Sequence, residues 1–424
     1  MADLLAGKVT IFAGAGISTE SRSVLKHTFY ESIAEELKVA PSSFTFPELM
    51  EKYCALPNGR FKLLKEIRDR FDHIRSFPEL NRSATRFHQE LGTFFPVRTI
   101  VTTNWDTYFE EYCRATPFTT DPDLAFWDAA DRRVLKLHGS IANFGSIVAT
   151  TGDYRKCRQR LRVGVLGGLL KTILATQTVL FVGYSLSDFD FVAIYEFVKS
   201  QMGALQKQAY VVTPDVEGAK KFKKAGLIPV TTDGTFFVEQ IKKHALAIDP
   251  CWLGDEIYDA ASDLLERVLR EHHALHRAIK VVDHPELIYA ASYQDGIVHA
   301  LERAVELRGS GQYSHAHRIQ GVIHSYLEWQ RDKLRCGIYE DVAYIEGYIN
   351  ALAYLLAKRK ERTKVRIPLY FMFGVETEIF GLRDFITMLK RKPNAHEASL
   401  RRARRELRAL SQPDSVEFHH LPWL

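Results

Sequence analysis

The stretch that most constrains the fold is Val9–Ser18, VTIFAGAGIS. An apolar, β-prone run leads directly into Ala13-Gly14-Ala15-Gly16, and a helical pattern follows Ser18. A buried strand that ends in small residues lets backbone N–H groups approach a phosphate, and Gly14 and Gly16 tolerate backbone angles that other residues resist. A nucleotide site is therefore one hypothesis for this turn, and an ordinary tight turn is the alternative.

Further strand-like runs alternate with helical patterns over the next two hundred or so residues. Strands are predicted at residues 98–103, 134–137, 178–182, 209–213 and 227–231; helices are predicted at 24–39, within 41–97, and at 107–113, 191–202 and 216–225; residues 115–131 are predicted to be a loop. The run TVLFV at 178–182 is apolar enough for a strand covered on both faces. This alternation predicts an α/β fold with a doubly wound parallel sheet.

Polar residues follow the second predicted strand. Thr102, Thr103 and Asn104 stand at its carboxyl end, and Asp106 precedes the next helical pattern. In an open parallel sheet the carboxyl ends of strands line the ligand crevice, so these residues are candidates for ligand contact. The alternative is structural, because Asp106 or Asn104 could cap the following helix.

Two more strand ends carry candidate residues. His138 follows the strand at 134–137 and precedes Gly139, and an imidazole that titrates near neutrality suits a general base, although a structural histidine is the alternative. Gly183 and Ser185 follow the strand at 178–182, where small size would expose the backbone. Asp190 stands three residues after Ser187, the spacing of a capping box, so we interpret it as structural.

Composition excludes several classes of protein. A formal net charge of +5 over 424 residues does not by itself require a nucleic acid. The five cysteines are scattered and include no C-x-x-C pair, which argues against disulfides and a zinc ribbon and favours a reducing cytoplasm. We expect neither a secretory signal nor a membrane span, because the apolar runs are too short.

The composition shifts near Asp249-Pro250, a plausible linker that predicts domains at 1–248 and 249–424. Helices are predicted at 257–272, 285–293, 297–308, 313–334, 340–358 and 381–390, and a strand at 366–375. This mainly α-helical domain shows no catalytic pattern, so we expect an interaction, regulatory or oligomerisation role. Four histidines cluster in it (His272, His273, His276 and His284), but the adjacent pair faces apart on a helix, and no metal site is predicted.

Residues 390–408 form a basic segment with eight basic and two acidic side chains. They are Lys390, Arg391, Lys392, Arg401, Arg402, Arg404, Arg405 and Arg408, against Glu397 and Glu406. Such an excess could bind nucleic acid or an acidic partner. No aromatic residues are interleaved for base stacking, so a solvated helix or a subunit contact is the favoured interpretation.

Four motifs stand in order along the chain: GAGIS (14–18), TTNWD (102–106), LHGS (137–140) and GYSLSDFD (183–190). Together they resemble the sirtuin (Sir2) superfamily in its bacterial SIR2-like branch. The resemblance implies a Rossmann-like domain that binds NAD, with the turn at 14–18 on the pyrophosphate. It further implies that Asn104 and His138 are catalytic, His138 being the general base, and that Asp106 lies at the carboxamide. The implied NAD contacts are Ala13, Gly14, Ala15, Gly16, Ser18, Thr103, Asp106, Gly183, Tyr184 and Ser185.

The departures from this family are informative. Sirtuin deacylases carry a zinc module with two C-x-x-C pairs after the His-Gly, whereas residues 140–182 contain only Cys157, so we expect no zinc. The stretch after GAGIS also differs, and no groove for an acyl-lysine peptide is recognisable. Water is then the natural acceptor, and hydrolysis of the nicotinamide–ribose bond of NAD is the expected reaction. A deacylase or ADP-ribosyltransferase, and a non-catalytic NAD or ADP-ribose sensor, are the alternatives.

The resemblance also implies a biological setting. SIR2-like proteins with a helical extension look like cytoplasmic anti-phage effectors of bacteria that assemble into large homo-oligomers. A HerA-type ATPase or an Argonaute-like protein is the implied partner, and a toxic NAD hydrolase is expected to be restrained until it is triggered.

Overall fold

The computed structural model describes the whole chain apart from residues 1, 19, 22–23, 185–188, 358, 363, 392–395, 410–417 and 423–424, and apart from the side chains of residues 42, 189–194 and 359–360. The chain divides into two compact units, Met1–Ala245 and Leu246–Leu424. The boundary between them falls inside helix α11 (Gly234–Ile248).

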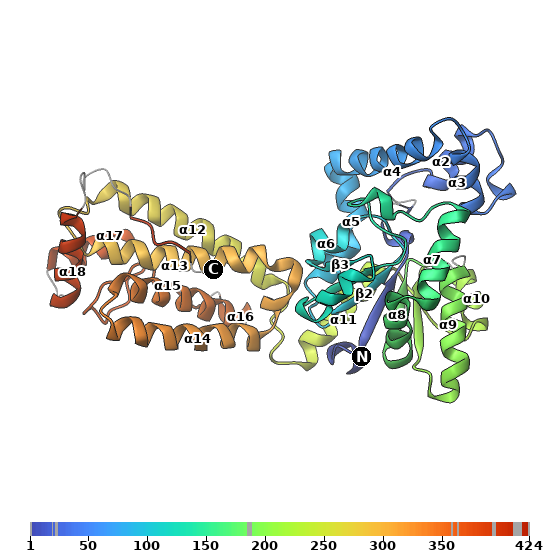
Figure 1. The fold of residues 1–424 in the computed structure, drawn as a ribbon. Coiled ribbons are helices and arrows are strands. Elements are labelled where there is room, and N and C mark those ends of the chain that lie inside the picture. The colour runs from blue at the N-terminus through green and yellow to red at the C-terminus, as the bar shows by residue number, and fades with distance from the viewer. Residues whose placement is uncertain are drawn as a thin grey trace. The chain divides into compact units, whose positions relative to one another are not determined.

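A seven-stranded sheet forms the centre of the first unit, and every strand pair in it is parallel (Figure 1). The order is β3-β4-β2-β1-β5-β6-β7. The strands are β1 (Val9–Ala13), β2 (Thr99–Thr102), β3 (Thr116–Phe118), β4 (Arg133–Lys136), β5 (Thr178–Val182), β6 (Ala209–Thr213) and β7 (Ile228–Thr231). The predicted doubly wound parallel sheet is confirmed. The short strand β3 lies inside the predicted 115–131 loop, so that prediction was wrong at Thr116–Phe118.

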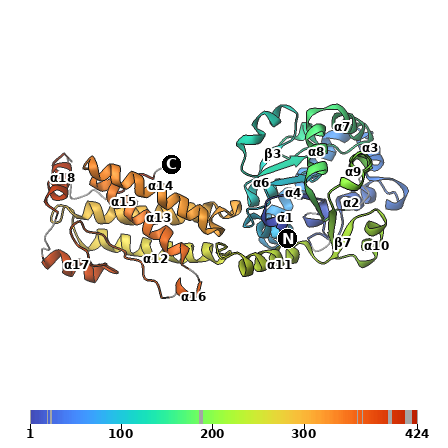
Figure 2. The same cartoon turned by 90° about the horizontal axis from the view of Figure 1, so that it is seen from below.

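Helices cover both faces of this sheet (Figure 2). The helices of this unit are α1 (Ala2–Leu5), α2 (Phe29–Glu36), α3 (Phe46–Cys54), α4 (Gly59–Ser76), α5 (Pro78–Gly92), α6 (Tyr108–Cys113), α7 (Thr151–Val163), α8 (Val165–Thr176), α9 (Phe189–Met202), α10 (Val216–Lys224) and α11. Of these, α2, α3 and α4 pack with α5 and α6 in a core cluster that includes no strand residue. Phe12, Val101 and Phe181 pack in one core cluster with apolar residues of α7, α8 and α9. Val182 points to the opposite face, where it lies beside Gly234 of α11 and Phe87 of α5.

The predicted helix at 24–39 is shorter in the structure because a capping box starts it late. The Thr28 side chain accepts from the Glu31 amide while the Glu31 carboxylate accepts from the Thr28 amide, which fixes the first turn of α2.

The second unit is mainly helical, as predicted. Its helices are α12 (Glu256–Ala278), α13 (Leu287–Glu306), α14 (Ala316–Arg335), α15 (Tyr339–Leu356), α16 (Arg359–Arg362), α17 (Leu382–Arg391) and α18 (Glu397–Arg408). Helix α13 packs along both α12 and α15 (Figures 1 and 2). Two helices were predicted where α13 runs unbroken through Gly296. A Cβ at Gly296 would lie 2.0 Å from the Tyr344 carbonyl oxygen, so this glycine allows two helices to approach rather than ending one.

The strand predicted at 366–375 was wrong. Only an isolated bridge joins Tyr370 to Ile379. The backbone carbonyls of Pro368 and Leu369 instead accept hydrogen bonds from the side chains of Tyr293 (2.9 Å) and Gln294 (2.9 Å) on α13. The apolar run is therefore held partly by helix side chains and partly by the Ile379 carbonyl, which accepts from the amides of Leu369 (2.9 Å) and Tyr370 (3.2 Å).

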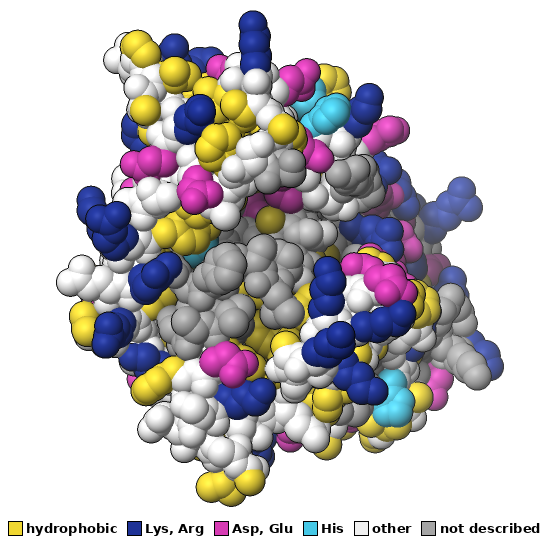
Figure 3. All heavy atoms as spheres, turned by 90° about the vertical axis from the view of Figure 1, so that its right-hand side faces the viewer, with side chains coloured by type: hydrophobic (Ala, Val, Ile, Leu, Met, Phe, Trp, Pro, Cys, Tyr) yellow, Lys and Arg dark blue, Asp and Glu magenta, His cyan; other side chains and the backbone are white. Residues whose placement is uncertain are grey.

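Charged side chains are dispersed rather than gathered in one field. On the face of the first unit seen in Figure 3, Lys and Arg are mixed with Asp and Glu. In the basic segment of the second unit, Arg402 of α18 pairs with Glu340 (3.2 Å) and with Glu406. No helix in the described part of the chain is long and apolar enough to cross a membrane.

Candidate active site

Four strand ends meet at one edge of the sheet. Ala13 at the end of β1 pairs with Thr102 of β2 on one side and with Val182 of β5 on the other. Thr102 in turn pairs with Lys136 at the end of β4. The motifs that follow these strands, far apart in sequence, therefore emerge side by side (Figure 1).

The glycine turn after β1 packs directly on the turn after β5. The amides of Gly14 and Gly16 donate to the carbonyls of Val182 (2.9 Å) and Gly183 (3.0 Å). A Cβ on Gly14 would lie 2.4 Å from the Gly183 oxygen, and Gly183 has a φ of +61°. The close contact between the two turns therefore requires glycine at these positions. The amides of Gly14 and Gly16, which were expected to bind a phosphate, instead donate to carbonyls of the protein. The amide of Ala15 has no acceptor among the described residues.

Asn104 is the centre of a buried polar network. Its Nδ2 donates to the Gly14 carbonyl (3.2 Å) and to Ser18 Oγ (3.4 Å). Its own amide donates to Thr102 Oγ1 (3.0 Å), which donates to the Ala13 carbonyl (2.9 Å). Its Oδ1 is buried and has no donor within the described part of the chain. An unpaired buried acceptor is costly, and it indicates a position where a ligand or water donates.

Asp106 has partners for both carboxylate oxygens. Oδ2 accepts from Ser18 Oγ (3.1 Å), and Oδ1 accepts from the amide of Tyr108 (3.2 Å), the first residue of α6. Asp106 is not the N-cap of α6, which is Thr107, but its carboxylate accepts from the first amide of that helix. Because Ser18 also receives a hydrogen bond from Asn104, Asp106 holds the β1 turn and the β2 loop together.

Sequence reasoning missed a buried ion pair beneath this loop. Lys136 at the end of β4 is fully buried, and its ammonium lies 2.9 Å from the Glu110 carboxylate of α6. The same ammonium donates to the backbone carbonyl of Asp106. The available signal was a lysine inside the otherwise apolar run VLKL at 134–137.

His138 follows β4 by two residues, as Asn104 follows β2 by two, so the two lie at matching positions on neighbouring strands. His138 is buried, and its ring stands edge-on to Tyr154 at a centroid distance of 4.9 Å. Gly139 has a φ of +83° and leaves no room for a Cβ, which would lie 2.1 Å from the Ser146 oxygen. The amide of Ile141 donates to the Trp105 carbonyl (2.8 Å), which ties the two loops together.

The other predicted residues divide into three groups. Thr103 is partly exposed beside Asn104. Tyr184 is buried, and its ring packs on Phe12 (5.2 Å) and Phe181 (5.6 Å) in the core. Ser185, and the side chain of Asp190, lie outside the described residues.

A second imidazole, that of His88 on α5, lies behind the loop against Tyr108 and Phe109. Complete burial lowers the pKa of His88 to about 4, so its imidazole is neutral at physiological pH. Neither ring nitrogen has a hydrogen-bond partner among the described residues.

The parallel sheet and its polar strand ends define a doubly wound α/β domain with a candidate ligand site at the carboxyl edge. More particularly, residues 98–229 match the family model of the SIR2-like domain. The predicted resemblance is confirmed for this part of the chain, which contains the Asn104, His138 and Gly183 motifs.

Three curated proteins are similar to about half of this chain. Identity is 26% over 213 residues with Defense-associated sirtuin 2 of Bacillus subtilis, covering 48% of this chain and 20% of that protein. It is 27% over 230 residues with the NAD(+) hydrolase ThsA of Cytobacillus dafuensis, covering 50% and 44%. It is 27% over 220 residues with the ThsA of Enterococcus faecium, covering 49% and 43%. The chain spans less than half the length of each of these relatives.

Proposed function

We propose that the first unit hydrolyses the nicotinamide–ribose bond of NAD to give nicotinamide and ADP-ribose, and that the protein depletes NAD in bacterial defence against phage. The names of the relatives and the SIR2-like match over 98–229 support this class of activity. The observation that carries the proposal is the buried Oδ1 of Asn104, which has no donor among the described residues and lies at the strand end next to His138.

The reaction needs little acid catalysis. Nicotinamide in NAD is already cationic, so it leaves as a neutral molecule when its bond to the ribose carbon breaks. The ribose carbon then carries oxocarbenium-like charge, and water adds to it. A carbonyl oxygen such as Asn104 Oδ1 accepts a hydrogen bond from that water or from a ribose hydroxyl. His138 takes the proton that the water loses and returns it to solvent.

The other candidate residues would position the substrate and the side chains of Asn104 and His138. The free amide of Ala15 would donate to the pyrophosphate, while the amides of Gly14 and Gly16 hold the turn in shape. Asp106 acts as a positioning residue through Ser18, since both of its carboxylate oxygens already have donors. The partly exposed Thr103 would meet a ribose hydroxyl.

The proposed regulation follows from the resemblance to bacterial SIR2-like proteins. The protein is expected to act in the cytoplasm as a large homo-oligomer, with low activity until a HerA-type ATPase or a nucleic acid bound by residues 390–408 releases it.

Product analysis tests the proposal. Wild type, Asn104→Ala, His138→Ala and the surface control His324→Ala are incubated with NAD alone, with DNA and with a HerA-type ATPase. We expect nicotinamide and ADP-ribose from wild type and control, and a loss of about 10²-fold or more in both site variants. NAD binding and circular dichroism establish that the variants are folded.

Two results contradict the proposal. One is turnover at the wild-type rate in folded Asn104→Ala and His138→Ala. The other is unchanged NAD in every condition while NAD binding is measurable, which would favour the non-catalytic sensor.

A further inference from the structure

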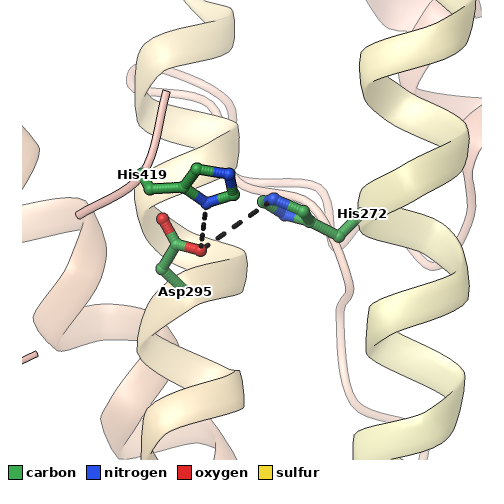
Figure 4. Close-up of side chains that lie close together, drawn as sticks. All are labelled: His272, Asp295 and His419. Carbon is green, nitrogen blue, oxygen red and sulfur yellow. Dashed lines mark hydrogen bonds and ion pairs between the residues drawn. The ribbon is translucent and has the colours of Figure 1, made fainter. Parts of the chain in front are cut away.

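The second unit contains a cluster of imidazoles around one carboxylate that the proposed reaction does not use. His272 and His276 lie one turn apart on α12, Asp295 lies in the middle of α13, and His419 comes from the short segment Phe418–Pro422. One nitrogen each of His272 and His419 and one oxygen of Asp295 lie within 4.8 Å of one another. Figure 4 shows the two rings converging on the carboxylate between α12 and α13.

The spacing of the donor atoms resembles a coordination shell. His272 Nε2 lies 3.2 Å from His276 Nε2, and His419 Nδ1 lies 3.4 Å from Asp295 Oδ1. Tetrahedral Zn²⁺ with bonds of about 2.0–2.1 Å separates neighbouring ligand atoms by about 3.3 Å. His272 Nε2 lies 4.0 Å from Asp295 Oδ1, and a small rotation of either side chain would shorten this distance.

Neighbouring groups orient these donors. Gln294 Nε2 donates to the Leu369 carbonyl (2.9 Å), so its Oε1 faces His272 Nδ1 at 3.1 Å. That nitrogen must therefore carry the proton, and the lone pair of His272 Nε2 points into the cluster. Asp295 Oδ2 accepts from the amide of His420 (2.7 Å), which leaves Oδ1 for the cluster. Such outer hydrogen bonds are typical of metal-binding histidines and carboxylates.

A cation between the two acceptors of the cluster would be attracted by both. The lone pair of His272 Nε2 and the carboxylate of Asp295 are both acceptors, and they face each other across 4.0 Å.

We propose that His272, Asp295 and His419 bind one divalent transition-metal ion, and that Zn²⁺ suits this set of two imidazoles and one carboxylate best. The ion ties the segment Phe418–Pro422 to α12 and α13. The segment has a second attachment, because His420 Nε2 lies 3.0 Å from Asp341 Oδ1 and its ring stacks on Tyr344 at 4.1 Å. Losing the metal therefore loosens the segment without releasing it.

The test uses the full chain, stripped with a chelator, incubated with Zn²⁺ and desalted. We expect about one Zn²⁺ per chain by elemental analysis. We also expect visible absorption of tetrahedral type with Co²⁺, and a rise of about 5–10 °C in the melting temperature at saturating Zn²⁺. His419→Ala should weaken Zn²⁺ binding by about 10-fold or more. His273→Ala is the matched control, since it removes an exposed imidazole next to His272 on the same helix.

His419 has a half-exposed side chain, 55% accessible, so its replacement leaves the packed core intact and the loss of binding can be measured in folded protein. Binding of less than about 0.1 Zn²⁺ per wild-type chain would overturn the proposal. Equal binding by wild type and His419→Ala would also overturn it. Either result would leave a metal-free cluster in which His276 donates to His272 and His419 donates to Asp295.

Discussion

The buried ion pair between Lys136 and Glu110 offers a sharp test of how the candidate site is held. Lys136→Met replaces a fully buried ammonium with an apolar side chain of similar length. The substitution leaves the Glu110 carboxylate, which is 16% exposed, without the cation 2.9 Å away, and it leaves the Asp106 carbonyl without its donor.

The magnitude follows from the geometry. At 2.9 Å and an effective dielectric constant of about 20, the attraction between two unit charges is about 6 kcal/mol. Part of this attraction offsets the cost of burying the ammonium. Lys136→Met should therefore lower the free energy of unfolding by about 3–5 kcal/mol. Lys136→Met/Glu110→Gln removes both charges and should recover most of this loss. Burial already raises the pKa of Glu110, so the deficit of Lys136→Met should shrink as the pH falls and the carboxylate becomes neutral.

Urea unfolding and NAD turnover are measured on the three proteins. Lys65→Met is the matched control, because Lys65 and Asp69 are 2.7 Å apart but their side chains are 59% and 49% exposed, so no measurable change is expected. In the stable double variant, turnover should fall by about 10-fold or more because Asp106 loses the donor that fixes its loop. The reasoning is refuted if Lys136→Met costs under about 1 kcal/mol, or if the double variant is no more stable than the single one.

Two further predictions concern the surroundings of the site. Gly14→Ala places a Cβ 2.4 Å from the Gly183 carbonyl oxygen, so it should lower the free energy of unfolding by about 1–3 kcal/mol and reduce turnover. The exposed Gly168 of α8 has nothing within 4 Å of a Cβ, so Gly168→Ala should stabilise by about 0.5–1 kcal/mol, and equal effects of the two changes would contradict the steric argument. The folded-state pKa of His88 is about 4 against an ordinary 6.5, so the unfolded chain takes up this proton first as the pH falls. Stability from this residue is complete above about pH 6.5 and falls by about 3 kcal/mol toward pH 4. His88→Leu should flatten the pH dependence of urea unfolding in that window, and an unchanged slope would show that the imidazole is not buried in its neutral form.

Local patterns were sufficient for most of the fold. Apolar runs such as TVLFV at 178–182 and the small residues after them are short-range signals, and the alternation with helices leaves few topologies open. Strand β3 escaped prediction because it is three residues long and contains Pro117, as an edge strand can. The run at 366–375 is apolar like a strand, but two of its carbonyls accept from side chains of α13, and two of its amides share the single carbonyl of Ile379.

The candidate site also combines features that the sequence indicates with features that only the structure shows. Asn104 and His138 could be selected as candidates from the sequence because each is a polar residue at the end of a strand-like run, and their catalytic roles stay predictions. The joint role of Ser18 and Asp106 could not, since it depends on a hydrogen bond between residues 88 positions apart.

The sequence alone determined the parallel α/β class, the mainly helical second part and the strand ends at which polar groups stand, because each of these depends on neighbours a few residues away. Only the tertiary structure decided what those groups contact. It assigned Gly14 to a packed turn, brought Lys136 beneath the Asp106 loop and gathered His272, Asp295 and His419 around one point. Contacts of this kind form when distant segments are brought together by burial of apolar surface, and no short stretch of sequence encodes them.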